Sequence, residues 1–274
     1  MRKERIVITG GGSGLGRALA LEYARAGWRV AVLDRDGASA EAVAAEVENA
    51  GGRGLAITCD VTDADAVDTA ATRLRRGWRG LDVLVNNAGI AGSGTVVETP
   101  EEDWRRIMEV NLFGVVRICR AFVPAMIRAG SGHVVNIASA AGFVSAPGMA
   151  AYNVSKAGVI SLSESLRVEL APHGVGVSVV CPSFFKTNLL EDFSGSEEAR
   201  QMAQRLMEKS PLDAGDVARL IRRGVRRKTF MMVPHGDAWG TLMLKRLAPE
   251  LFFGVVKKRT ASMLTRRAGR GARA

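Results

Sequence analysis

The chain has 274 residues, of which 47% are apolar, so it is long enough for one large α/β domain with a sizeable core. Its three cysteines, Cys59, Cys119 and Cys181, are widely spaced and odd in number, which argues against a disulfide framework or a metal site and favours the cytoplasm. The apolar run at residues 6–8 is too short for a secretory signal, and no stretch reaches the ~18 uninterrupted apolar residues of a membrane-spanning helix.

The net charge of +10 is concentrated towards the C-terminus. Residues 219–274 hold 15 Lys and Arg but two acidic residues, whereas residues 1–218 hold 23 and 26 and are nearly neutral. Basic charge without aromatic stacking platforms argues against a nucleic-acid partner. We expect a domain over residues 1–236 and a basic amphipathic extension over 237–274, with 266–274 disordered.

Short β-branched stretches alternate with helical patterns along the chain. The expected strands lie at residues 5–9, 29–33, 54–58, 82–85, 133–138, 175–181 and 230–233, the last of them at a sheet edge. Helices are expected over 38–50 and 101–128, among others. This alternation predicts an α/β fold: a doubly wound, Rossmann-like parallel sheet of about seven strands with helices on both faces, which binds ligands at the carboxyl ends of its strands.

The first expected strand leads into a glycine-rich turn and then a helix. Gly10, Gly14 and Gly16 follow a G-x3-G-x-G spacing, with Ser13 and Leu15 between them. Such a turn lets a pyrophosphate approach the backbone N–H groups at the helix N-terminus. The alternative is an ordinary glycine-rich turn, but the flanking strand and helix favour dinucleotide binding.

Candidate contacts for the adenosine part of a dinucleotide follow the next two strands. Asp34 lies 18 residues after Gly16, at a distance suited to the ribose hydroxyls, and its carboxylate repels a 2′-phosphate. This favours NAD, although Arg35 could bind that phosphate or stack on the adenine, so NADP stays open. Asp60 could accept from the adenine amino group, with Val61 packed on the ring; alternatively, Asp34 caps a helix and Asp60 a loop.

Tyr152 and Lys156 are four residues apart, so they share one face of a helix. An ammonium about 4 Å from a phenol in a partly buried cleft favours the phenolate by about 3 pKa units, which suits a general acid–base near pH 7. Ser139 follows an apolar run and could hydrogen-bond the same substrate oxygen. Asn111 lies inside the long expected helix, where it would need a role such as holding a backbone distortion or a water. Taken alone, Tyr-x3-Lys is also compatible with a surface tyrosine and a solvated lysine.

Together these motifs resemble those of the classical short-chain dehydrogenase/reductase family, over roughly residues 4–235. The matching pieces are Thr9-Gly10-x3-Gly14-x-Gly16, Asp60-Val61, Asn86-Asn87-Ala88-Gly89, Asn111, Ser139 and Tyr152-x3-Lys156. The resemblance implies that Tyr152 is the proton donor and acceptor and that Ser139 orients the substrate oxygen. It implies that Lys156 lowers the pKa of Tyr152 and holds the nicotinamide ribose.

The resemblance also implies further cofactor contacts. Asn111 would keep a water in a proton relay, Thr187 would bind the nicotinamide carboxamide, and the backbone after Pro182 would contribute. Asn87, Ala88 and Gly89 would line the cofactor. The family usually has Pro-Gly where this chain has Pro182-Ser183, so the local turn is less well defined. A homodimer or homotetramer is expected from the same resemblance.

Residues 188–215, with a helix over 197–209, are expected to form a substrate lid. The expected pocket residues are Phe143, Val144, Met149, Phe184, Phe185, Leu189, Leu190 and Phe193, with Lys186 as the anchoring charge. They indicate an NAD(P)-dependent oxidoreductase that interconverts a hydrophobic secondary alcohol and its ketone. Two alternatives are a non-catalytic dinucleotide-binding sensor or scaffold, and a lipid-directed reductase recruited to a membrane surface by the basic tail. The tail could equally pack on a partner subunit, and His133, His173 and His235 are expected to be structural.

Overall fold

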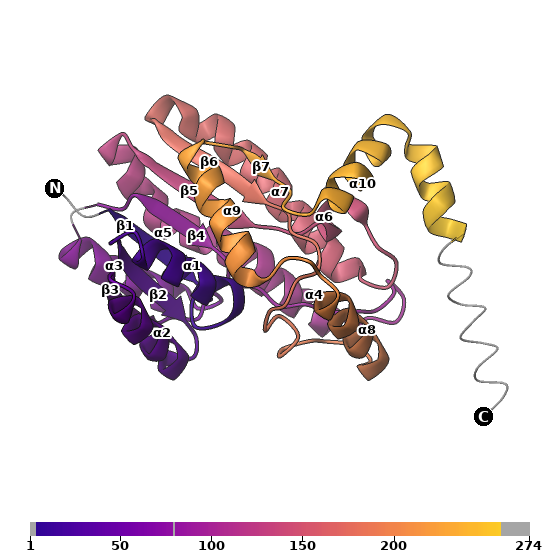
Figure 1. Cartoon of the computed structure of the whole chain (residues 1–274), viewed down its shortest axis with the longest axis horizontal. Helices are drawn as coiled ribbons and strands as arrows, with labels where there is room; N and C mark the ends of the chain where they lie inside the picture. The colour runs from indigo at the N-terminus through magenta and orange to yellow at the C-terminus, as the bar shows by residue number, and fades with distance from the viewer. Residues whose placement is uncertain (1–3, 79, 259–274) are drawn as a thin grey trace.

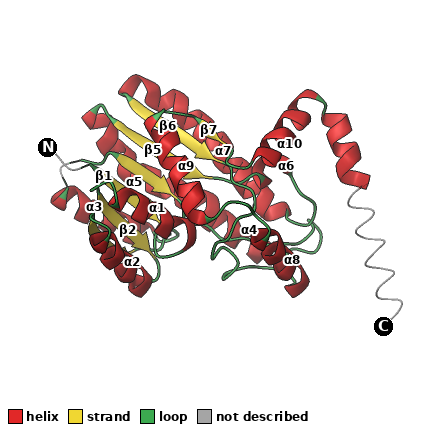
Figure 2. Ribbon diagram, in the orientation of Figure 1, coloured by secondary structure: helices red, strands yellow, loops and turns green. Residues whose placement is uncertain are grey.

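One seven-stranded sheet forms the centre of the computed structural model, which describes residues 4–78 and 80–258. Its strand order is β3-β2-β1-β4-β5-β6-β7, and every pairing is parallel (Figure 2). The strands are β1 (Arg5–Thr9), β2 (Arg29–Asp34), β3 (Arg53–Thr58), β4 (Val83–Asn86), β5 (Gly132–Ile137), β6 (Val175–Val180) and β7 (Met231–Met232). The predicted doubly wound parallel sheet is confirmed, and each strand lies within one residue of its expected bounds.

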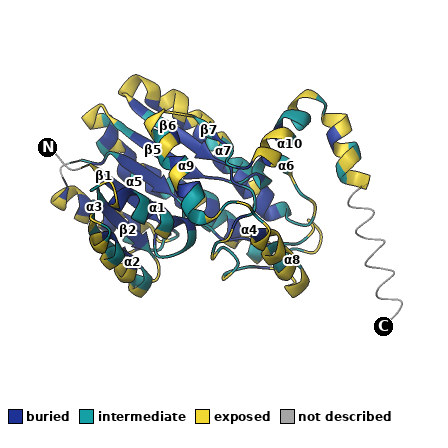
Figure 3. Ribbon diagram, in the orientation of Figure 1, coloured by how far each residue is buried: buried dark blue, intermediate teal, exposed yellow. Residues whose placement is uncertain are grey.

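Helices cover both faces of the sheet (Figure 1). One face carries α1 (Gly14–Ala24), α2 (Gly37–Asn49) and α9 (Ala214–Arg226), and the other carries α3 (Ala64–Gly77), α5 (Gly114–Ala129) and α7 (Ala150–Leu170). The helices α4 (Glu101–Met108), α6 (Ala141–Val144) and α8 (Glu197–Glu208) belong to the connections at the carboxyl ends of the strands, and the 3-10 turn η2 (Ala171–His173) leads into β6. Figure 3 shows the strands as a buried layer between amphipathic helices.

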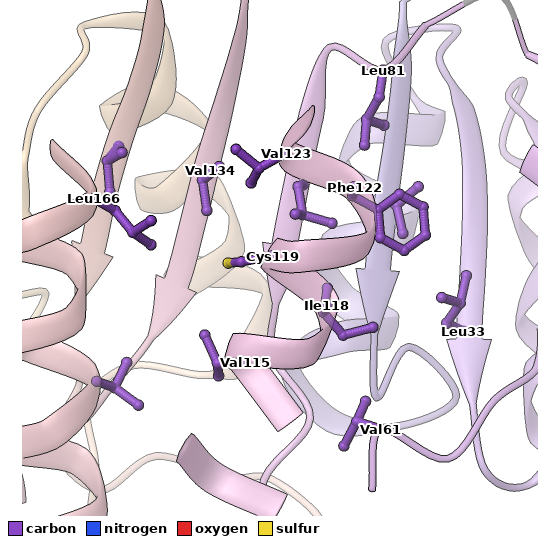
Figure 4. Close-up of a cluster of buried hydrophobic side chains, with 14 of the residues drawn as sticks. Leu33, Val61, Leu81, Val115, Ile118, Cys119, Phe122, Val123, Val134 and Leu166 are labelled. Carbon is purple, nitrogen blue, oxygen red and sulfur yellow. The ribbon is translucent and has the colours of Figure 1, made fainter. Parts of the chain in front are cut away.

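The longest helical stretch, Glu101–Ala129, is long and apolar enough to span a membrane by composition, with a mean hydropathy of 1.6 in its most apolar window. In the structure its second half, α5, lies on the sheet and buries Val115, Ile118 and Phe122 in the core (Figure 4). Its apolar composition is therefore accounted for by packing against β4, β5 and the neighbouring helices.

The stretch expected as one helix over 101–128 is interrupted by a π-helical turn, η1 (Glu109–Phe113), between α4 and α5. Asn111 sits in this turn and is fully buried. Its Oδ1 accepts from Ile90 N at 2.8 Å, and its Nδ2 donates to Ile90 O and to Ser155 Oγ, both at 3.0 Å. The local backbone distortion predicted from a buried mid-helix asparagine is therefore present, and it ties η1 to both the loop after β4 and to α7.

A chain of buried polar side chains fixes α7 against the sheet. Asn86 Nδ2 donates to Asn136 Oδ1 at 2.8 Å, and Asn136 Nδ2 donates to Ser163 Oγ at 2.9 Å. Ser163 then donates to the carbonyl of Val159 within α7 at 2.6 Å. Buried polar groups are costly unless paired, so this chain specifies one position of the helix on β4 and β5.

The C-terminal part of the described chain projects from the body as an arm, formed by α10 (Gly236–Leu247) and a second helical segment at residues 249–258 (Figure 1). Lys245 Nζ donates to Phe143 O at 2.7 Å and lies within 6 Å of the ring centres of Phe252 and Phe253, joining the arm to α6. The expected disorder of 266–274 concerns residues that lie outside the described part of the chain.

Candidate active site

The carboxyl ends of β1 and β4 are joined by hydrogen bonds at the point where the strand order reverses. Thr9 Oγ1 accepts from the backbone N–H groups of Asn87 and Ala88 at 3.0 and 3.1 Å. Asn87 Nδ2 donates to the carbonyls of Thr9 and Gly10 at 3.0 and 2.9 Å. A doubly wound sheet binds ligands in the crevice at this reversal, so these contacts define one wall of the candidate site.

The glycine turn after β1 leaves room that only glycine provides. A Cβ on Gly16 would lie 2.0 Å from Gly10 O, and Gly14 has a positive φ of 49°. Ser13, the N-cap of α1, makes no side-chain capping bond, and the first turn of α1 holds no acidic residue. The N-terminal N–H groups and the positive end of the helix dipole thus suit a pyrophosphate.

At the end of β2, the Asp34 carboxylate accepts from Gly12 N at 2.9 Å and from Asp36 N at 3.1 Å. The helix cap of α2 is Asp36 and not Asp34, since Asp36 accepts from Ala38 N at 3.1 Å. Arg35 forms an ion pair with Asp192, which comes from the loop before α8. Asp34 therefore borders the glycine turn, while the guanidinium of Arg35 points towards the carboxylate of Asp192.

After β3, Asp60 Oδ1 accepts from both the backbone N–H and the hydroxyl of Thr62 at 2.8 Å. This is the loop-capping contact that was the alternative to adenine recognition. Asp60 still lines the cleft beside Val61, so the two roles are compatible.

These elements enclose a cleft with a volume of about 470 Å³. Of the expected cofactor-binding residues, it is lined by Gly10, Ser13, Gly14, Leu15, Asp34, Arg35, Asp60, Val61, Asn87, Ala88, Gly89 and Thr187. Gly16 lies behind this lining, against Gly10, whereas Pro182, Tyr152 and Lys156 line the adjoining pocket. The glycine turn, the uncapped helix N-terminus and the carboxylate at the end of β2 all fit a nicotinamide dinucleotide.

Tyr152 and Lys156 lie in the first two turns of α7, and both are almost completely buried. Lys156 Nζ donates to Ile137 O at 3.0 Å and lies 5.8 Å from the centre of the Tyr152 ring. A Cβ on Gly89 would lie 3.3 Å from Lys156 Nζ, so the ammonium reaches the backbone after β4. Ser139 Oγ accepts from Ala141 N at 3.1 Å and faces the Pro182 carbonyl at 3.4 Å.

The protonation of this pair differs from the expectation. Burial raises the pKa of Tyr152 to about 12, and hydrogen bonding with Ser139 acts in the opposite direction without compensating for it. Burial also lowers the pKa of Lys156 to about 8. The prediction that the Lys156 ammonium brings the Tyr152 pKa towards neutrality is wrong for the protein alone, because desolvation penalises both charged forms.

Next to this pair is an apolar cavity of about 210 Å³. Among the residues expected there, Val144, Met149, Phe184, Phe185, Leu189, Leu190 and Phe193 line it, joined by Ala203 and Met207 of α8. Two expectations are wrong: Phe143 points into the core, and Lys186 is exposed outside the cavity. Of the lining side chains, only Lys156 can carry a charge at neutral pH.

His235 has a role that the sequence did not specify. Its Nδ1 accepts from Ser183 N at 3.2 Å, and its ring lies 6.3 Å from that of Phe185. The histidine thus holds the backbone at the position where Ser183 replaces the usual glycine. Arg106 and Asp192 were also missed as cleft residues, because they come together only in the folded chain.

A family model described as short chain dehydrogenase matches residues 4–198. The chain belongs to this family. The classical short-chain dehydrogenase/reductase membership predicted from the motifs is thereby confirmed, and solved structures support it. A short-chain dehydrogenase/reductase from Burkholderia phymatum in complex with NAD is 30% identical, with a TM-score of 0.86 over 91% of this chain and 95% of that one. A dehydrogenase from Sphingobium yanoikuyae in complex with NADPH is 29% identical, with a TM-score of 0.75 over 89% and 93%.

Curated relatives of this short-chain dehydrogenase differ in length and name. A protein of Mycobacterium tuberculosis named "Probable oxidoreductase EphD" is 40% identical over 68% of this chain, which spans only 31% of that protein. The 3-oxoacyl-acyl-carrier-protein reductase of Synechocystis is 36% identical over 69% of this chain and 76% of its own length. Dehydrogenase/reductase SDR family member 7B of Bos taurus is 33% identical over 94% and 82%.

Proposed function

We propose that this chain is an NAD(P)-dependent oxidoreductase that interconverts a hydrophobic secondary alcohol and its ketone. The observation that carries the proposal is the junction of two cavities: a polar cleft suited to a dinucleotide adjoins an apolar cavity that is lined by Tyr152 and Lys156. Gly89 and Thr187 line both cavities, and Lys156 Nζ would lie 3.3 Å from a Cβ on Gly89, so a cofactor and a substrate would be brought together there. We propose the cytoplasm and a homo-oligomer as its setting.

In this proposal, Tyr152 gives its phenolic proton to the ketone oxygen, or takes the proton of the alcohol in the reverse direction. Ser139 holds the same oxygen through its hydroxyl, and buried Lys156 binds the nicotinamide ribose. Asn111 would keep a water for a proton relay from Lys156 to solvent. A bound nicotinamide supplies the hydride chemistry, and the chain supplies position and protons.

The cofactor is proposed to be NAD. The Asp34 carboxylate, which accepts from the N–H groups of Gly12 and Asp36, would contact the adenosine ribose hydroxyls and repel a 2′-phosphate. Matched structures hold either NAD or NADPH, so the family alone does not decide the preference.

A panel of alcohols and ketones tests the proposal. We expect turnover, followed at the absorbance of the reduced nicotinamide, to increase with apolar chain length until the cavity of about 210 Å³ is filled. Burying each additional methylene is worth about 0.8 kcal/mol, or roughly a fourfold gain in kcat/KM. Dinucleotide binding without turnover of any member would instead favour the sensor or scaffold. A preference for small polar or charged substrates would contradict the proposed substrate class.

The arm supports a second candidate function, the recruitment of this enzyme to an anionic membrane surface. Leu247 is 83% exposed, Leu251 61% and Trp239 48%, and Lys257 and Lys258 follow on the same segment (Figure 3). Apolar side chains beside clustered cations are typical of helices that lie on anionic lipid. A contact between two arms would instead bring like charges together.

Removing this apolar surface should weaken vesicle binding. We expect Leu247→Ser/Leu251→Ser to sediment several-fold less with phosphatidylcholine vesicles containing phosphatidylserine, while native protein stays unbound to phosphatidylcholine alone. The control is Val97→Ser, which removes a 94%-exposed valine outside the arm and should bind as the native chain does. Equal sedimentation of both variants would favour packing of the arm on a partner subunit over binding to lipid. Cross-links between the arms of two subunits that stay unchanged when vesicles are added would favour the same conclusion.

A further inference from the structure

One loop segment contributes side chains to both cavities. Asn188, Glu191 and Asp192 line the dinucleotide cleft, Leu190 and Phe193 line the apolar cavity, and Leu189 lines both. We refer to residues 188–195, between the Pro182–Thr187 turn and α8, as the dividing segment. On the cleft side, its Asp192 reaches Arg35 at the end of β2, which is the adenosine end of the proposed dinucleotide site.

The dividing segment is held in place near Asp192 by contacts that do not involve Arg35. Ser93 N donates to Ser194 O at 2.7 Å, and Ser194 N donates to Ala91 O at 3.2 Å. Arg106 of α4 donates to the Asp192 carbonyl at 3.4 Å and to the hydroxyl of Ser194. The backbone of Asp192 is thus fixed by residues that follow β4, so its carboxylate projects from a defined position.

That carboxylate is paired with Arg35, the residue next to Asp34 at the end of β2. The hydrogen bond with Asp192 is the main cause that raises the pKa of the Arg35 guanidinium, and the negative charges of Asp60 and Asp34 act in the same direction. Arg35 lines the cleft next to Asp34, so it would be available to an adenosine 2′-phosphate if Asp34 contacts the ribose. Its charge is already matched by an aspartate that belongs to the other side of the cleft.

We propose that Asp192 is a positioning residue for cofactor specificity, which holds Arg35 in an ion pair and so disfavours NADP. The inference rests on the proposed function, because it requires that a nicotinamide dinucleotide occupies the cleft. A 2′-phosphate carries a charge of about −1.5 to −2 and needs a cation. To provide one, Arg35 would have to leave a carboxylate whose backbone is anchored on the opposite wall. Since both side chains are partly exposed, the Arg35–Asp192 pair adds little to the stability of the fold. Its effect is on which of the two cofactors, NAD or NADP, is bound.

The test compares the Kd values of NADH and NADPH by titration calorimetry, which requires no substrate. In Asp192→Asn we expect the preference for NADH over NADPH to fall by about tenfold, mostly through tighter NADPH binding, a shift of about 1.4 kcal/mol. Asp192→Glu keeps the carboxylate and should restore the native ratio. In Asp192→Asn/Arg35→Ala the gain in NADPH binding should disappear, because the released guanidinium is what binds the phosphate.

A matched control is Glu191→Gln. Glu191 lines the same cleft one residue earlier, but its carboxylate accepts from Asn188 Nδ2. This variant removes the same charge and should leave the NADH/NADPH ratio near its native value. An equal shift in Glu191→Gln and Asp192→Asn, a shift that survives loss of Arg35, or no shift at all would each overturn the inference. Failure of the native protein to bind either dinucleotide would overturn the proposed function itself.

Discussion

Tyr152→Phe is expected to lower turnover by about 10²–10⁴-fold, the range that a positioned general acid–base contributes. The substitution removes only the phenolic hydroxyl from a side chain that is 6% exposed, so the packing of α7 should remain. Lys156 still donates to Ile137 O and does not need the hydroxyl to stay in place. The Kd of NADH should therefore stay near its native value while kcat collapses.

The chain provides a matched control for this variant, since it has only two tyrosines. Tyr23 is also buried, packs edge-to-face on Trp28 at 4.8 Å, and its hydroxyl has no hydrogen-bond partner in the described residues. Tyr23→Phe should leave turnover unchanged and leave stability unchanged or slightly higher, because an unpaired buried hydroxyl is removed. Tyr152→Phe with native kcat would refute the acid–base assignment.

The pKa values of the pair give the direction of the pH dependence. With a Tyr152 pKa of about 12, the phenol is protonated at neutral pH and ready to donate to a ketone. Alcohol oxidation needs the phenolate, whose fraction grows as pH rises towards that pKa. Oxidation should therefore accelerate with pH, and this dependence should be lost in Tyr152→Phe.

Gly16→Ala is expected to weaken dinucleotide binding by about 100-fold. Its Cβ would lie 2.0 Å from Gly10 O and 2.7 Å from Asn87 Nδ2, so either the glycine turn or the wall of the crevice must move. Overpacking against a rigid neighbour costs about 1–3 kcal/mol, and here the upper end applies because the main obstacle is backbone. The turn follows the carboxyl end of β1 and lies outside the hydrogen-bonded sheet, so the fold should survive.

The measurement is NADH calorimetry, with circular dichroism to verify folding. Gly240→Ala serves as the control, because that glycine lies inside α10 and an added Cβ would meet nothing within 4 Å. Alanine at position 240 should leave the stability of the fold unchanged or increase it, because it lowers the conformational entropy of the unfolded chain. Native NADH affinity in a folded Gly16→Ala protein would contradict the proposed location of the pyrophosphate.

Much of the fold could be predicted because its signals are local. Most of the strands are short β-branched runs, and the glycine turn and Tyr152-x3-Lys156 are contiguous, so the parallel sheet and most of the cleft lining follow from neighbours in sequence. The distortion at Asn111 was also predictable, because a buried asparagine inside a helix needs a role.

The errors and omissions come from long-range packing. The Tyr152 pKa depends on how completely α7 is covered, and spacing carries no information about burial. Asp192 meets Arg35 across 157 residues, and His235 meets Ser183 across 52, so neither pairing leaves a pattern in sequence. Lys186 was assigned to the cavity because it is next to Phe185, although the backbone turns it outward.

The polar chain from Asn86 through Asn136 to Ser163 has a consequence for how substrate range can change. It anchors α7, the helix that carries Tyr152 and Lys156, to the centre of the sheet. By contrast, α8 contributes side chains to the lining of the apolar cavity but takes no part in this polar chain. Residues 196–208 could thus be exchanged for those of a relative while the proton-transfer pair keeps its place. Chimeras at this boundary offer a route to new specificities on an unaltered catalytic frame.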